Sequence, residues 1–310
     1  MKKIDLGNSS CFIGEELSIG ANFKIGKNSV IRATKCVIGD NVSIGSDNSF
    51  LVGEELVINS NATLGNKNDI TCLSCSFGEY LFLDSNVIIG HGGKFNYDSK
   101  IQVGKHCMIC AYVKLNVNYA ITIGDDVGIG EYVDVWTHGS FPPVLQGFPA
   151  QFGPVTIGNN VWLPAKSTVL ANVTIGNDVV IGVNSLINKN LPSGCLAGGI
   201  PVKIIKENYY PNPNKEKNTA LIHDVLNEYS KLMAFKNIMS NIVFNEIDFE
   251  IKCNDVIFNL NNQEVVGELN KNDEDFRDFL RRRGIKFFTG KPFVSVLPEC
   301  YTKLLNYENN

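Results

Sequence analysis

A six-residue repeat runs through the first two-thirds of this 310-residue chain, from about residue 10 to residue 205. Each unit opens with an aliphatic residue, glycine or another small or polar residue follows, and the pattern returns six positions later. The longest unbroken run has its aliphatic positions at Ile157, Leu163, Val169, Ile175, Ile181 and Ile187. A register kept this long predicts a solenoid whose inward aliphatic side chains stack into one continuous core.

Three such units would form one triangular coil of about 18 residues, and the repeat is long enough for about nine coils. Glycine and asparagine suit the turns between short strands because both tolerate positive φ. The alternative is an all-β sandwich, but sandwich strands do not keep a six-residue register over this length. The repeat therefore favours a parallel β-helix.

One long interruption separates Val135 from Val155. It adds roughly 16 residues, with four prolines and three phenylalanines between residues 137 and 154. We expect a loop this apolar to pack against a neighbouring coil, a partner subunit or a ligand. Because a regular coil offers only a scaffold, the loop is also where we look first for function.

The residues around this loop resemble the hexapeptide-repeat acetyltransferases, especially sugar O-acetyltransferases such as those for galactosides and maltose. The motifs that carry the resemblance are Ile121–Asp125, Trp136–His138, Pro154–Trp162 and Leu196–Lys206. The resemblance implies a left-handed β-helix that uses acetyl-CoA to acetylate a sugar or glycan hydroxyl, in surface polysaccharide assembly. It also implies a homotrimer with sites between subunits.

By this resemblance His138 is the general base. A sugar hydroxyl is a weak nucleophile towards a thioester, and removing its proton as it attacks accelerates transfer by about 10²–10⁴. Imidazole titrates near neutrality and suits that role. Glu131 and Asp134 could orient the ring, and the alternative is that both are solvated residues of the coil.

The coil period adds candidates for contact with the acceptor. Stacking places the unit of Val135 over that of Leu115, so His138 lies over Asn118 with Asn116 nearby. Both asparagines, together with Trp136, are therefore candidate acceptor-binding residues. The alternative for the asparagines is a structural ladder at the corners of the coils.

The resemblance also implies a coenzyme A site. Trp162 would line the pantetheine arm, and the backbone N–H of Ala165 would bind the thioester and stabilise negative charge. This chain has Pro164 where the family often has glycine. The candidates to bind the phosphates of coenzyme A are Lys189, Lys203 and Lys206, and Pro201 would pack near the adenine. The alternative for each lysine is an ordinary surface charge.

Composition excludes several classes of protein. Lys2 and Lys3 are not followed by an apolar stretch, so no secretory signal is expected, and no apolar run reaches the length of a membrane span. The net charge of −4 does not indicate a protein that binds nucleic acid. Nine cysteines, an odd number, favour reduced thiols in the cytoplasm.

Two cysteine pairs, Cys72–Cys75 and Cys107–Cys110, have a spacing seen in zinc sites. The first cysteine of the second pair, however, falls on a buried small position of the repeat. The histidines His91, His106 and His138 fall on different faces of the predicted coils. We therefore expect no metal.

After Lys206 the repeat ends, which divides the chain into a β-helix over 1–206 and a small α+β domain over 207–310. We expect an amphipathic helix around residues 221–233, strands with a hairpin between 242 and 268, and a helix from Asp273 to Gly284. A strand near Ile285–Phe288 would follow. Arg281–Arg283 suits the end of a helix dipole, or alternatively binds an anionic acceptor.

Two other functions remain open at this point. The same scaffold could carry an N-acyltransferase for a nucleotide-linked amino sugar, since an amine also needs deprotonation. It could also have lost catalysis and serve as a scaffold, although the intact Trp136–His138 segment speaks against that.

Overall fold

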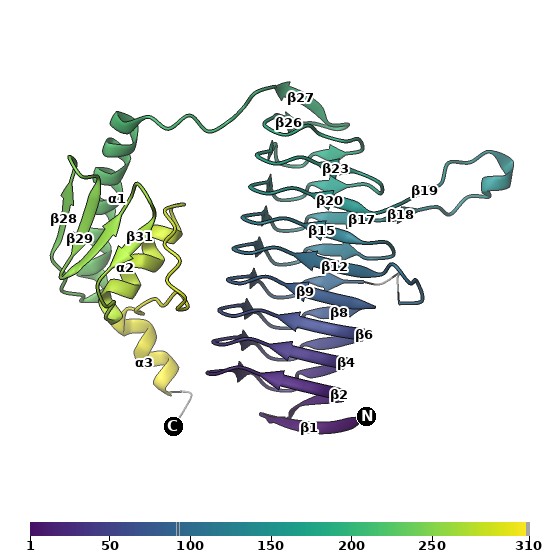
Figure 1. Ribbon diagram of the computed structural model, residues 1–310, viewed down its shortest axis with the longest axis horizontal. Coiled ribbons are helices and arrows are strands. Elements are labelled where there is room, and N and C mark those ends of the chain that lie inside the picture. The colour runs from purple at the N-terminus through teal and green to yellow at the C-terminus, as the bar shows by residue number, and fades with distance from the viewer. Residues whose placement is uncertain (91, 93, 308–310) are drawn as a thin grey trace. The chain divides into compact units, whose positions relative to one another are not determined.

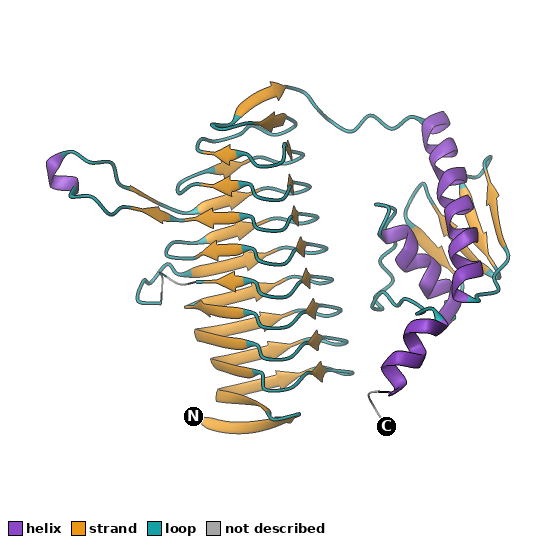
Figure 2. Cartoon of the chain, turned by 180° about the vertical axis from the view of Figure 1, so that it is seen from behind, coloured by secondary structure: helices purple, strands orange, loops and turns teal. Residues whose placement is uncertain are grey.

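A computed structural model describes residues 1–90, 92 and 94–307 (Figure 1). The chain forms two compact units, Met1–Tyr210 and Pro211–Asn310. The first is a β-solenoid with three faces, and Figure 2 shows a short helical turn, the one helical segment among the described residues of this unit, in a projecting arm. None of the described helices is long and apolar enough to cross a membrane.

The chain visits three faces in turn. The first coils contain long strands that bend from face 1 to face 2, namely β2 (Ser10–Ile19), β4 (Val30–Ile38) and β6 (Ser49–Ile58). Face 1 continues with β8 (Asp69–Cys72), β11 (Ile88–Ile89), β14 (Lys114–Asn116), β17 (Asp134–Trp136), β22 (Thr168–Val169) and β25 (Leu186–Ile187). Face 2 continues with β9 (Ser74–Phe77), β12 (Lys100–Val103), β15 (Ile121–Ile123), β20 (Val155–Ile157) and β23 (Thr174–Ile175).

Face 3 is a separate sheet of short parallel strands. It consists of β3 (Lys24–Ile25), β5 (Ser43–Ile44), β7 (Thr63–Leu64), β10 (Phe82–Leu83), β13 (Met108–Ile109), β16 (Gly128–Ile129), β21 (Trp162–Leu163), β24 (Val180–Ile181) and β26 (Leu196–Gly198). One strand per coil makes about nine coils, as the repeat predicts.

The register confirms the stacking of the repeat. On face 1 Leu115 pairs with Val135, and on face 3 Ile129 pairs with Leu163, always in parallel. These aliphatic side chains point inward and are buried in one continuous core. Parallel pairing in every coil rules out a sandwich.

Antiparallel strands cover both ends of the solenoid. At the N-terminal end β1 (Lys2–Gly7) pairs antiparallel with β2. At the other end β27 (Lys203–Lys206) pairs antiparallel with β26. Repeat proteins need such terminal elements because an open coil leaves its core and its sheet edges exposed.

The corners show that glycine and asparagine serve different purposes. Asn22, Asn41 and Asn160 adopt positive φ, as expected. Of the repeat glycines that follow aliphatic residues, Gly90 has a positive φ, but others such as Gly124 do not, and the prediction was wrong for those. A Cβ on Gly124 would lie 2.8 Å from the backbone carbon of Gly158 in the next coil, so glycine is needed for close stacking.

The long interruption forms an arm that leaves the solenoid (Figure 1). Its base is a short antiparallel ladder of β18 (His138–Gly139) and β19 (Gln151–Phe152), and its tip carries the 3₁₀ turn η1 (Val144–Gln146). Phe141 and Leu145 are fully exposed. These two side chains at the tip therefore pack on none of the described coils.

The C-terminal unit packs helices on one antiparallel sheet. Its elements are α1 (Lys215–Lys236), β28 (Ile242–Asn245), β29 (Glu250–Cys253), β30 (Val256–Asn259), β31 (Glu264–Val266), α2 (Lys271–Arg281) and α3 (Glu299–Tyr307). The hairpin between β30 and β31 confirms the prediction. Residues 285–288 form no strand, contrary to expectation, because the buried Arg277 side chain donates to the carbonyl oxygen of Phe287 at 2.9 Å.

Candidate active site

Two excursions leave the solenoid at the corner that joins face 1 to face 2, here called corner 1–2. The first connects β11 to β12, and the second is the arm between β17 and β20. The coil between them turns this corner through residues 116–120, without an excursion. Both interruptions of the repeat therefore border one location.

His138 lies at the base of the arm on this corner, partly buried. Its Nδ1 atom is buried and has no hydrogen-bond partner among the described residues. A buried ring nitrogen without a partner carries a desolvation cost, so its presence is a reason to suspect function.

Asn116 lies beside His138. It is the outward residue of β14, yet its side chain is only 7% exposed, and its Oδ1 atom is buried without a partner among the described residues. A Cβ on Gly92 would lie 2.9 Å from Cε1 of His138 and 3.3 Å from both amide atoms of Asn116. The imidazole and the amide therefore converge on one point.

Thr137 links the two coils of this corner. Its Oγ1 donates to the carbonyl oxygen of Asn116 at 2.7 Å and accepts from the N–H groups of Asn118 and Tyr119 at 2.9 and 3.0 Å. The side chain is fully buried. Sequence reasoning quoted Thr137 only as part of a motif, and the signal that it missed is the inward position of this threonine in the coil.

The other residues predicted near the base are placed less closely. Asn118 is half-buried on the same corner, and Trp136 is partly exposed on the outer surface of face 1. Glu131 and Asp134, the candidates to orient the ring, form no hydrogen bond with Nδ1 of His138. Glu131 belongs to the preceding corner and Asp134 lies on face 1, ahead of the corner, which favours the alternative that both are solvated coil residues.

The predicted coenzyme A residues gather on face 3. Trp162 is 40% exposed on β21, and a Cβ on Gly128 in the coil below would lie 2.5 Å from its indole. Glycine at 128 therefore allows the indole to lie along the face. On the same side, exposed to solvent, are Lys203 and Lys206 of β27 and Pro201 in the turn before it.

Ala165 lies at the corner that joins face 3 to face 1. Its backbone N–H donates to no group of the described residues. At the corner between faces 2 and 3 the corresponding N–H of Asp125 donates to Asn159 Oδ1 at 2.8 Å. This difference between the two corners leaves the role predicted for the N–H of Ala165 as a prediction.

Lys189 is separated from the other lysines. It follows β25 and is exposed at corner 1–2, two coils beyond the coil of His138. The structure thus brings Lys203 and Lys206 together and leaves Lys189 on another side of the solenoid.

One chain does not unite the two halves of the predicted site. In a three-faced prism, the corner between faces 1 and 2 lies opposite face 3. His138 and Asn116 occupy that corner, whereas Trp162 and Lys203 occupy the opposite face. The core of the solenoid separates them.

The cysteines and histidines form no metal site among the described residues. Cys72, Cys75 and Cys107 lie in the hydrophobic core, as the repeat predicts for the last of them. Burial is the first cause that raises the pKa of Cys75, which makes its thiolate unfavourable. Nδ1 of His106 lies 3.5 Å from Oδ1 of Asp126 at another corner. His91 lies outside the described residues.

The C-terminal arginines are all paired with carboxylates, two of them with the same one. Arg281 and Arg282 each approach Asp278 at 2.7 Å, and Arg283 pairs with Glu228. This arrangement favours the interpretation as the end of a helix over a patch for an anionic acceptor.

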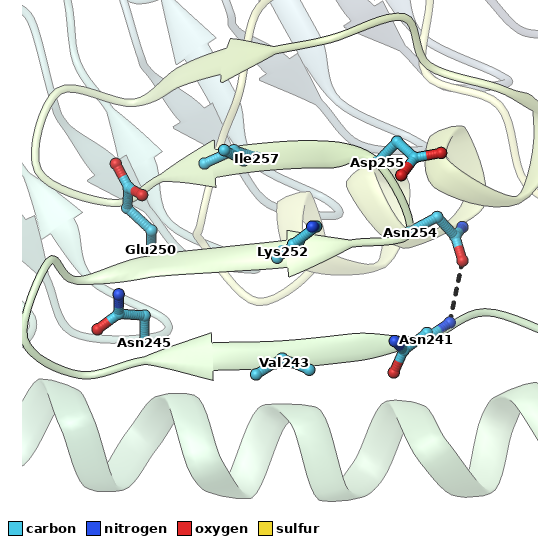
Figure 3. Close-up of a pocket in the computed structure, with 8 residues that line it drawn as sticks. All are labelled: Asn241, Val243, Asn245, Glu250, Lys252, Asn254, Asp255 and Ile257. Atoms are coloured by element: carbon cyan, nitrogen blue, oxygen red, sulfur yellow. Dashed lines mark hydrogen bonds between the residues drawn. The ribbon is translucent and has the colours of Figure 1, made fainter.

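The outer surface of the C-terminal sheet has a shallow hollow of about 650 Å³ (Figure 3). Lys252 lies at its centre, and the amide of Asn254 accepts from the N–H of Asn241 at 3.0 Å at one end. None of the residues predicted for acetyl transfer lines this hollow.

Comparisons with known proteins identify the family of the chain. Residues 154–189 match the family described as bacterial transferase hexapeptide (six repeats). The putative colanic acid biosynthesis acetyltransferase WcaF of Escherichia coli K12 is 31% identical over 125 residues, which cover 40% of this chain and 68% of WcaF. The chain belongs to the hexapeptide-repeat acetyltransferase family.

Other members match over shorter parts of their length. Galactoside O-acetyltransferase of Escherichia coli K12 is 33% identical over 115 residues, which cover 36% of this chain and 57% of that enzyme. The chain thus spans little more than half the length of this relative. A solved galactoside acetyltransferase in complex with coenzyme A is 28% identical over 42% of this chain and 64% of its own, with a TM-score of 0.36.

Proposed function

We propose that this protein transfers the acetyl group of acetyl-CoA to a hydroxyl of a sugar or glycan, with His138 as general base. The observation that carries the proposal is the convergence of the His138 imidazole and the Asn116 amide at the base of the arm. The names of the relatives, a galactoside and a colanic acid acetyltransferase, support a carbohydrate acceptor and a role in surface polysaccharide biosynthesis. The unpaired cysteines favour a cytoplasmic location.

The transfer follows from these groups. Nε2 of His138 takes the proton of the acceptor hydroxyl while its oxygen attacks the thioester carbonyl carbon. The N–H of Ala165 donates to the oxyanion that forms. The C–S bond then breaks, and the imidazolium returns the proton to the thiolate, which leaves an ester and free coenzyme A. Proton transfer through imidazole supplies the activation, so the step requires no metal.

The acceptor half and the donor half come from different copies of the chain. His138 and Asn116 lie opposite Trp162, Lys203 and Lys206, so a complete site needs corner 1–2 of one copy against the donor side of another. The exposed apolar tip of the arm fits a partner subunit in the same way. A homotrimer, as in the family, closes such head-to-tail contacts into a ring.

The proposal is tested by measuring coenzyme A release from acetyl-CoA with a panel of sugars, glycans and one amino-sugar nucleotide. With the preferred acceptor, His138→Ala should lower kcat/KM by about 10² or more, because the base is lost. An unchanged rate in the variant would contradict the mechanism. Preference for the amino-sugar nucleotide would instead identify an N-acyltransferase.

A further inference from the structure

The connection after β11 begins with Gly90, a glycine in a conformation that other residues rarely adopt. Gly90 has a φ of +119°, and a Cβ there would lie 2.1 Å from the carbonyl oxygen of Thr71. Its N–H donates to the carbonyl oxygen of Leu115 at 2.9 Å. Only glycine suits this position.

Gly92, two residues later, approaches side chains that belong to other coils of the solenoid. Gly92 belongs to the coil of Ile89, whereas His138 belongs to the coil two steps further along, beyond that of Asn116. Neighbouring strands lie about 4.8 Å apart, so this contact spans about 10 Å along the stack. Repeat stacking alone brings no such pair together.

Gly92 lies against both side chains of the candidate site. Its Cβ position is 2.9 Å from Cε1 of His138, closer than real Cβ contacts, and 3.3 Å from Oδ1 and Nδ2 of Asn116. This contact explains why the outward Asn116 is almost fully buried. The φ of Gly92 does not fall in the left-handed range, so glycine is needed here for space and not for conformation.

We propose that Gly92 is a positioning residue for acetyl transfer, in that its backbone braces the His138 imidazole at Cε1 and covers the Asn116 amide. The brace holds Nδ1 on the buried side and leaves Nε2 towards the acceptor. It replaces the carboxylate that often orients a catalytic histidine, because neither Glu131 nor Asp134 contacts the ring. The kinetic effect expected of this contact rests on the function proposed above, but the contact itself can be tested without an activity assay.

The direct test is nuclear magnetic resonance on the wild-type protein with labelled histidine and glycine. The chain has four histidines, so the Cε1–H signal of His138 can be assigned by its loss in His138→Ala. We expect a nuclear Overhauser effect between this proton and the Hα protons of Gly92. Its absence would overturn the proposal, whatever the enzyme activity turns out to be.

The kinetic test compares two glycine variants. Gly92→Ala should lower kcat with the acceptor by about 10- to 100-fold, since small displacements of catalytic groups cost that much, and leave KM for acetyl-CoA unchanged. It should also shift the Cε1–H signal of His138. Gly139→Ala is the matched control: Gly139 is the next residue after His138, yet a Cβ there meets nothing within 4 Å. We expect near wild-type values for it.

A double variant separates positioning from general damage. In the His138→Ala background, Gly92→Ala should cause no further loss, because the group that it positions is gone. Equal losses in both backgrounds, or an unmoved His138 signal in Gly92→Ala, would overturn the proposal. If the wild type transfers no acetyl group to any acceptor, the proposed function fails, and the magnetic resonance result still decides the contact.

Discussion

Thr137 shows how a single hydroxyl can fix the geometry of a site without touching a substrate. Its Oγ1 satisfies one carbonyl oxygen and two N–H groups of the neighbouring coil, at Asn116, Asn118 and Tyr119. The next residue is His138. The hydroxyl therefore sets the height of the imidazole relative to the asparagine that shares its site.

Replacing Thr137 by valine should destabilise the solenoid and impair transfer. Valine keeps the shape but removes the hydrogen-bond partner of one buried carbonyl and two partly buried N–H groups, and a fully buried group left unpaired costs about 1–3 kcal/mol. We expect a lower midpoint of urea unfolding and a lower kcat. Thr137→Ser keeps the hydroxyl and is the control. If Thr137→Val and Thr137→Ser unfold at the same urea concentration, the hydrogen bonds are not what holds this corner.

At the scale of elements, α2 holds the irregular segment that follows it. Asp278 of α2 is buried and accepts from Arg281, Arg282 and Ser295. Burial by itself would raise the pKa of this carboxyl, but the hydrogen bonds from Arg281 and Ser295 outweigh it and the pKa is lowered. The carboxylate form is therefore the one that the fold prefers.

This preference makes the C-terminal unit sensitive to acid. A carboxyl with a lowered pKa contributes stability above its unfolded pKa, near 4, and the contribution is lost as pH falls through the folded pKa. Asp278→Asn should weaken that acid dependence and lower the free energy of unfolding at pH 7 by about 1.5–3 kcal/mol.

The loss of stability in acid can be measured from the amide hydrogen exchange of residues 285–297 as a function of pH. Glu299→Gln is a suitable control, because its partner Lys303 and Glu299 are both exposed and such surface pairs contribute little. Equal acid dependence in the wild type and Asp278→Asn would show that another group controls this segment.

At the scale of the whole molecule, the separation of His138 from Trp162 has a consequence for mixed assemblies. If each site joins two copies, two inactive variants can complement each other. Random co-assembly of His138→Ala with Trp162→Ala should restore about a quarter of the sites. A site is complete only when one copy supplies an intact His138 and its neighbour supplies an intact Trp162.

The measurement is coenzyme A release from co-expressed variants, with sedimentation to establish the assembly. Separately purified variants that are mixed without exchange of subunits serve as the control and should stay inactive. A monomer in sedimentation, or no recovery after verified co-assembly, would contradict a site shared between subunits.

The period of the sequence determined most of the fold. Inward aliphatic residues every six positions dictate which side chains face the core, because a strand with one buried face cannot slip without exposing it. The same arithmetic stacks Leu115 under Val135, and with them Asn116 near His138. The resemblance of the motifs around His138 indicated the family. Local and periodic rules suffice for such features.

Only the tertiary structure decided the contacts that break the period. The approach of Gly92 to His138 joins residues from coils two steps apart, and no repeat specifies such a contact. The partners of Thr137, the isolation of Lys189 and the failure of Glu131 and Asp134 to reach the ring are of the same kind. Non-periodic chain has many conformations of similar local energy, so packing against distant residues selects one of them.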